Sequence, residues 1–279
     1  MKRRQKVRVG TVKVPDELAE AHTLCFLLHD VLVEALRSGE EHGIFYSKVA
    51  LSDENDRRQL DEASDIFAWL EATGRESDRG RILSGVVLQA LLSDSLLCFY
   101  DALKASERGR LSTTFMLVRK PLQESLFLFE LMLIDPSEFG SLLASNPMKL
   151  RAGKVGGPEA HRVRIKRVLG IIQDSRFDAQ YISTLRYDKT SEDSFDGICN
   201  QAMHLFTEHR AIRTSELNIN FIFSSPEARL SQWRFLYSRL PYLLTYFSIV
   251  VECLMGRMAQ TDPQYMESIN RRICAQICL

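Results

Sequence analysis

The chain has 279 residues, of which 45% are hydrophobic and 26% are charged. This apolar fraction is too high for an intrinsically disordered chain, and 36 basic residues against 36 acidic ones exclude a polyelectrolyte tail. With 14 glycines and 8 prolines, the composition also excludes a fibrous or low-complexity protein. A chain of this length can bury a large core, as one domain or as two smaller ones.

The N-terminal residues predict a protein that stays inside the cell. Charge returns at Lys6, Arg8 and Lys13, so the basic start is not followed by the apolar run of roughly seven residues that a secretory signal needs. The apolar stretch 240–251 is twelve residues long and contains Pro241, whereas a membrane-spanning helix needs roughly 20 residues. The six cysteines form no CxxC pair and are typical of reduced core thiols. We therefore expect a cytoplasmic protein with no membrane contact, no metal and no cofactor.

Apolar residues at helical spacing run through most of the chain. They predict helices over residues 16–39, 56–72, 79–106, 111–134, 159–173, 176–186, 191–209, 226–258 and 263–277. Two short segments, 6–14 and 217–223, alternate apolar and other residues as strands do, and we expect them to pair. The fold class predicted is mostly α, a multi-helix bundle with a minor two-stranded β element.

Residues 135–158 interrupt the helical pattern. Three of the eight prolines and four of the fourteen glycines fall there, which favours a loop or hinge. The segment separates an N-terminal strand and helical half, residues 1–134, from a C-terminal helical half, residues 159–279. The alternative is a single domain that includes both halves.

The predicted helix over 111–134 contains two unusual residues. Pro121 removes the hydrogen bond to the Leu117 carbonyl and predicts a kink. Glu130 lies within LFLFELMLI, which is apolar on every face, so we expect the carboxylate to be buried and paired. Arg119 is eleven residues away on the same face, roughly 16 Å along the helix, so it is too distant to be the partner. The partner is expected to be an arginine or histidine from the C-terminal half, in a structural ion pair or in a site.

Candidate catalytic residues come from two segments. Asn200, His204 and Glu208 are spaced by four, so they share one face of the helix predicted over 191–209. An imidazole held by such neighbours is either a general base or a satisfied core residue. With Arg119 and Glu124, which flank the kink at Pro121, Asn200 and His204 form the candidate catalytic set.

A basic segment, residues 149–167, carries seven positive charges against Glu159. The candidates for binding the phosphates of a nucleic acid are Arg151, Lys154, Arg162, Arg164, Lys166 and Arg167. No aromatic residues lie between them, so stacking on bases is not indicated. The alternatives are a solvated helix face and pairing with the acidic segment 52–65.

An arginine and a glutamate on a strongly apolar helix, followed by a histidine on a later helix, resemble bacterial HEPN-like helical proteins. The resemblance covers roughly residues 80–134 and 190–255. It implies an RNA-directed helical protein, and several members of the group belong to phage-defence or toxin systems. HEPN ribonucleases place a histidine four to six residues after an arginine, and neither His204 nor His209 has an arginine at that distance. The resemblance therefore implies a catalytically silent relative.

Two functions remain open at this point. The favoured one is a non-enzymatic helical interaction or assembly module, with a protein partner or further copies of itself, in a bacterial defence or toxin system. The alternative is a HEPN-like RNA-directed nuclease or a protein that binds RNA or another nucleic acid. Convergence of Arg119 and His204 in an open cleft would favour the alternative.

Overall fold

The computed structural model describes residues 12–216 and 225–278. The protein is 75% helical, and no strand occurs among the described residues, which confirms the mostly α multi-helix fold. Of the predicted β element, segment 217–223 and residues 6–11 lie outside the described residues. Residues 12–15 are described and form no strand.

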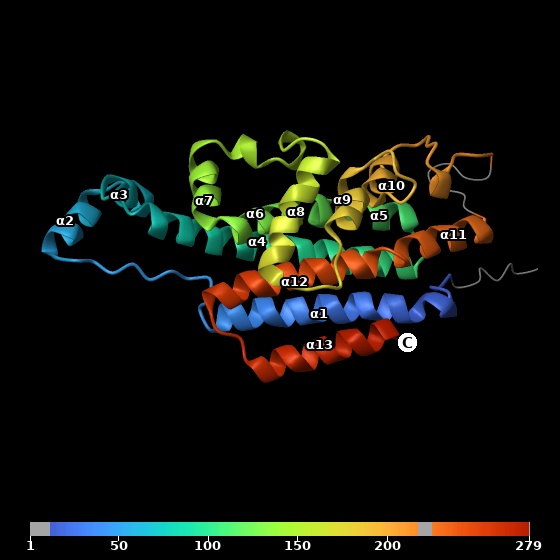
Figure 1. Cartoon of the computed structure of the whole chain (residues 1–279), viewed down its shortest axis with the longest axis horizontal. Coiled ribbons are helices and arrows are strands. Elements are labelled where there is room, and N and C mark those ends of the chain that lie inside the picture. The colour runs from blue at the N-terminus through green and yellow to red at the C-terminus, as the bar shows by residue number, and fades with distance from the viewer. Residues whose placement is uncertain (1–11, 217–224, 279) are drawn as a thin grey trace, which may run out of the picture.

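Five helices form the body of the molecule: α1 (Ala19–Glu41), α4 (Glu76–Glu107), α5 (Leu111–Lys120), α6 (Leu126–Ile134) and α12 (Leu240–Met258). Helices α1, α4 and α12 run along the long axis, and α13 (Pro263–Cys278) packs against α1 (Figure 1). The core is one continuous cluster to which residues before and after 135–158 contribute. Within it, the ring of Phe247 contacts Phe99 edge-on at 5.1 Å and Phe129 at 5.5 Å, joining α12 to α4 and α6.

Helix α4 is long and apolar, and only part of its apolar surface is buried in the core. Among the described residues it is the one helix whose length and mean hydropathy, 1.8 over 18 residues, would suit a membrane span, and 39% of that window is buried. Core helices of water-soluble proteins meet the same two conditions. Here α4 packs against α1, α5 and α7 (Pro136–Ser145).

The interruption predicted at Pro121 takes the form of a π-helical turn, Pro121–Ser125, between α5 and α6. Proline has no N–H to donate, so the regular ladder fails at this point. The Leu126 N–H instead donates to the Pro121 carbonyl, five residues back. Such turns insert a residue into a helix and are frequent at functional sites. Leu122 and Gln123 are buried here, while Glu124 is exposed.

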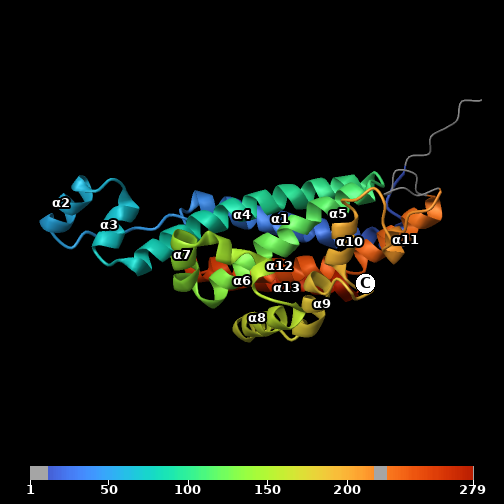
Figure 2. The same cartoon turned by 90° about the horizontal axis from the view of Figure 1, so that it is seen from above.

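The single helix predicted over 56–72 is wrong. Two helices occupy the region, α2 (Glu54–Glu62) and α3 (Ile66–Ala72), because Asp65 begins a new helix by accepting the Ala68 N–H at 2.9 Å. The pair forms an arm at one end of the body (Figures 1 and 2). Trp69 and Leu70 are buried within it.

The loop predicted over 135–158 is also wrong in its first half. Helix α7 (Pro136–Ser145) begins there, followed by two 3₁₀ turns, Pro147–Leu150 and Ala152–Lys154. Pro136 occupies the first helical position, where its missing N–H costs nothing, and Asp135 accepts the Glu138 N–H at 2.9 Å. Helix α7 crosses α4 closely, since a Cβ at Gly140 would lie 2.7 Å from the Gly80 Cα.

The C-terminal helices are α8 (Pro158–Ile172), α9 (Ala179–Tyr187), α10 (Phe195–Gln201) and α11 (Pro226–Tyr237), followed by α12 and α13. The helix predicted over 191–209 is wrong, because α10 ends at Gln201. The helix predicted over 226–258 is divided between α11 and α12 at Ser238 and Arg239.

Candidate functional site

Glu130 of α6 lies at the centre of a buried ionic cluster. It is fully buried, and its carboxylate accepts hydrogen bonds from Arg186 at 2.5 Å, Arg164 at 2.9 Å and the Tyr246 hydroxyl at 2.9 Å. Burial acts to raise the pKa of Glu130, but the two guanidinium groups outweigh it, so the pKa is lowered. The prediction that Glu130 is buried and paired with an arginine from the C-terminal half is confirmed.

His161 of α8 extends this cluster towards the surface. Its ring stacks on Tyr187 with 3.5 Å between centroids, and its Nδ1 lies 2.5 Å from Arg164. Burial, together with Arg164 and Arg186, lowers the pKa of His161 to about 4, so the imidazole is neutral near pH 7. A neutral Nδ1 can accept a hydrogen bond from Arg164, and the backbone of Ala152 acts on the pKa of His161 in the opposite direction, raising it. The histidine thus ties the loop before α8 to the buried cluster.

A cleft of about 850 Å³ opens above the cluster, between the π-helical turn, α7, α8 and the end of α9. Its apolar walls come from Val87, Phe127, Leu128, Phe139, Leu143, Pro147 and Leu150. Its polar side chains are Arg119, Gln123, Glu124, Arg151, Lys154, His161, Tyr187, Lys189 and Asp196. Its size and mixed lining are typical of a small-molecule site.

Asp196 forms the inner polar end of the cleft. Ser194 caps α10 by accepting the Gly197 N–H, which places Asp196 in the first turn. The carboxylate pairs with Arg119 at 3.1 Å and lies 3.9 Å from the Lys189 ammonium. It is 5% exposed, and this burial raises the pKa of Asp196 in spite of the two cations. A buried carboxylate is therefore the internal counter-ion of Arg119 and Lys189.

The cleft carries an excess of positive charge. Arg119, Lys189, Arg151 and Lys154 line it, against the carboxylates of Asp196 and Glu124. Arg151 and Lys154 are exposed, and no carboxylate in residues 12–216 or 225–278 lies within ion-pair distance of them. The buried ionic cluster carries a net charge of +1, because Arg164 and Arg186 share the single carboxylate of Glu130. The field in the cleft favours an anion.

The structure brings together only half of the candidate catalytic set. Arg119 and Glu124 line the cleft, but Asn200 and His204 do not. Because α10 ends at Gln201, His204 and Glu208 do not share a helix face with Asn200, and that prediction is wrong. His204 is exposed, and Arg119 and His204 do not converge in the cleft. A catalytic role for these residues stays a prediction.

The candidate nucleic-acid-binding residues divide into four groups. Arg151 and Lys154 line the cleft, while Lys166 and Arg167 are exposed on the outer face of α8. Arg162 pairs with Glu159 one turn away. Arg164 is 6% exposed and bound to Glu130, so it is not available to a phosphate. The reason is helical periodicity: Arg164 shares the inward face of α8 with the buried His161, Ile165 and Val168.

Sequence reasoning missed His161, Tyr187, Lys189 and Asp196, and also Arg186. One signal was present for Arg186, which lies four residues after Ile182 on the apolar face of its helix. A charged residue on such a face needs a buried partner. No comparable signal marks Lys189 or Asp196, because their meeting depends on how α9 and α10 pack.

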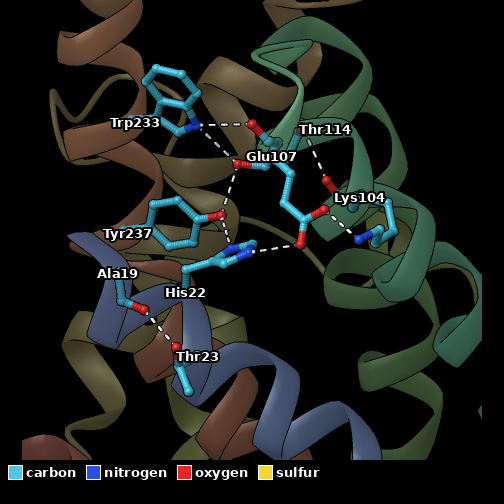
Figure 3. A network of polar contacts seen from close by, with 10 residues as sticks. Ala19, His22, Thr23, Lys104, Glu107, Thr114, Trp233 and Tyr237 are labelled. Atoms are coloured by element: carbon cyan, nitrogen blue, oxygen red, sulfur yellow. Dashed lines mark hydrogen bonds and ion pairs between the residues drawn. The ribbon is translucent and has the colours of Figure 1, made fainter. Parts of the chain in front are cut away.

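A second polar cluster joins α1, α4 and α11 (Figure 3). The Tyr237 hydroxyl lies 2.5 Å from His22 Nδ1 and 2.8 Å from Ser106 Oγ, and Trp233 Nε1 donates to the Ser106 carbonyl at 3.2 Å. His22 Nε2 faces Glu107 at 3.4 Å. Burial lowers the pKa of His22 and raises that of Tyr237. Ser106 and Tyr237 are buried, so this cluster holds helices together, and its residues do not line the cleft.

No group of three or more metal-binding side chains comes together in the part of the chain that the structure describes. The comparisons with known proteins give no match, whether with family models, curated proteins or solved structures. The function is therefore argued from the cleft.

Proposed function

We propose that the protein is a helical binding module that takes a phosphate ester in the cleft. The observation that supports this most is the pair Arg151 and Lys154, two cations without a carboxylate partner among the described residues, beside Arg119 and Lys189. Guanidinium and ammonium groups bind phosphate oxygens through charge-assisted hydrogen bonds. A phosphate would therefore fill the positions where the cleft has positive charge in excess.

The apolar wall suits the rest of such a ligand. Phe127, Leu128 and Phe139 lie on the side of the cleft formed by α6 and α7. A nucleotide has an apolar face on its base and a charge on its phosphate, and it fits a cleft of about 850 Å³. Free nucleotides and RNA strands share this chemistry, so the experiment must separate them.

Binding without catalysis is the form that the geometry favours. Arg164 engages Nδ1 of His161 and Tyr187 stacks on the ring, so the buried cluster holds the histidine that lines the cleft in place. The catalytic alternative depends on His204, which lies elsewhere. A relationship to HEPN-like proteins and a place in a defence or toxin system stay predictions from the sequence.

The test is a binding titration by fluorescence anisotropy at low salt. The ligands are labelled adenosine monophosphate, a labelled oligouridylate and, as a carboxylate control, labelled polyglutamate. We expect the phosphate ligands to bind and to weaken with salt, because phosphate contacts release counterions. Preference for the monophosphate would identify a nucleotide site, and preference for the oligouridylate an RNA site.

A matched pair of variants locates the binding. Arg151→Ala with Lys154→Ala should weaken binding about tenfold or more, since each charge-assisted bond contributes roughly 1.5–3 kcal/mol. Lys166→Ala with Arg167→Ala removes the same charge from the outer face of α8 and should leave binding unchanged. Equal losses in both variants, or no binding of any phosphate ligand by the unaltered protein, would contradict the proposal.

A further inference from the structure

The arm formed by α2 and α3 is strongly acidic and ordered. Residues 52–65 carry six carboxylates against Arg57 and Arg58, a net charge of −4. The arm is held in place by Arg75, which pairs with Asp56 and stacks over Trp69 at 4.7 Å. Its shape is therefore fixed before any partner arrives, which lowers the entropy that binding would cost.

The outward side chains of the arm are unpaired. Glu54, Asp61 and Glu62 are exposed, and none of them takes part in an ion pair within the described residues. Ile66, at the start of α3, is 41% exposed. The arm therefore presents unpaired carboxylates and one apolar side chain to the solvent.

The outer face of α8 has the complementary composition. Lys166 and Arg167 lie three and four residues after Val163, so the three side chains share one face of the helix. Val163 is 53% exposed, and neither Lys166 nor Arg167 pairs with a carboxylate in the described chain. This surface is separate from the cleft, whose lining includes none of these three residues.

Within one molecule the two surfaces do not meet. Both views place the arm beyond the end of the body, with α7 between it and α8 (Figures 1 and 2). Two unpaired faces of opposite charge on the same chain are complementary to each other when they come from two copies.

We propose that the acidic arm of one copy docks on the outer face of α8 of a second copy. The side chains of Glu54, Asp61 and Glu62 meet Lys166 and Arg167, and Ile66 lies against Val163. The two surfaces differ, so the contact is heterologous and repeats head to tail, giving a ring or an open chain. The proposal does not rest on the cleft or its ligand.

Sedimentation velocity on nuclease-treated full-length protein tests this. At about 50 mM salt we expect association that grows with protein concentration, and at about 500 mM salt we expect monomers, because exposed charges are screened. Two charge reversals remove the contact from either side: Asp61→Lys with Glu62→Lys on the arm, and Lys166→Glu with Arg167→Glu on α8. Each variant alone should be monomeric at low salt.

Restored association provides the decisive result. A mixture of the two reversed variants, and a single chain that carries all four changes, should associate again, because opposite charges then face each other. Such recovery also shows that the variants are folded. Arg151→Ala with Lys154→Ala should associate like the unaltered protein, which separates this proposal from that of the cleft.

Three outcomes would overturn the proposal. The unaltered protein could stay monomeric at low salt and high concentration. The reversed variants could associate as it does, or fail to associate when mixed. Association that nuclease treatment abolishes would assign the outer face of α8 to a nucleic acid instead of a second copy.

Discussion

The two buried polar clusters hold helices together by different chemistry. Around Glu130 the contacts are ionic, with two arginines, and the cluster opens towards the cleft through His161. Around Tyr237 the contacts join hydroxyl, imidazole and indole groups, and the one carboxylate, Glu107, lies at the margin. Each also joins distant segments, since Glu130 bonds Tyr246, 116 residues away, and His22 bonds Tyr237, 215 residues away.

Charged groups are buried in the cluster next to the cleft, whereas the cluster around Tyr237 uses mainly neutral groups. Neutral hydrogen bonds are enough to join α1, α4 and α11, since burying a charge is costly unless it is paired. Under the cleft, two arginines share one carboxylate, which leaves a positive charge below the site. This positive charge adds to the field that the proposed phosphate site would use.

Removing the central carboxylate should have the largest effect. Glu130→Ala leaves Arg164 and Arg186 buried without a counter-ion, and breaking a buried pair costs about 3–5 kcal/mol of unfolding free energy. Glu130→Gln should cost less, because part of the hydrogen bonding survives. Urea denaturation measures both, and an unchanged midpoint for Glu130→Ala would show that the cluster does not stabilise the fold.

The two clusters should also differ in pH dependence. The pKa of His161 is lowered to about 4 in the folded protein from about 6.5 in the unfolded chain, so the unfolded state binds more protons between these values. The contribution of His161 to the free energy of unfolding is therefore fully present above pH 6.5. It is lost as the pH falls towards 4, and its size is on the order of 3 kcal/mol.

Burial lowers the pKa of His22 as well, so its contribution has the same sign. We expect His161→Phe to reduce the pH dependence of unfolding more than His22→Phe does, because burial and two arginines act on His161. Urea midpoints measured from pH 7 to pH 4 compare the two. A larger reduction in His22→Phe would reverse this ranking of the clusters.

The cluster around Tyr237 should lose less unfolding free energy than the cluster around Glu130 when one group is removed. Tyr237→Phe removes the hydroxyl that joins His22 to Ser106, and unsatisfied buried partners cost about 1–3 kcal/mol. Tyr100→Phe is the control, because Tyr100 is 46% exposed. If thermal unfolding shows no difference between the two variants, the hydroxyl does not hold α11 to α4.

The smallest effect is expected within the cleft and rests on its proposed function. Asp196 competes with a bound phosphate for Arg119 and Lys189. Asp196→Asn should therefore tighten phosphate binding about threefold to tenfold, the range of roughly 1 kcal/mol. Weaker binding in this variant would mean that Asp196 positions Arg119 for the ligand.

Local patterns in the sequence determined much of this protein. Helical spacing is a property of neighbouring residues, so the predicted helices over 79–106 and 263–277 agree closely with α4 and α13. The burial of Glu130 followed from its apolar neighbours alone. The sequence also signals the start of α7, because Asp135 can cap a helix that has Pro136 at its first position and Glu138 in its first turn. The prediction of a loop is wrong there because it treats proline only as a helix breaker.

Tertiary structure decided what those patterns leave open. Nothing local to Glu130 specifies Arg164 and Arg186, which lie on two other helices and reach it only because α6, α8 and α9 pack together. The same holds for Asp196 with Arg119, 77 residues apart. Periodicity tells which side of a helix faces inward, but only the packing of helices determines which charged groups meet there, and that packing formed the cleft.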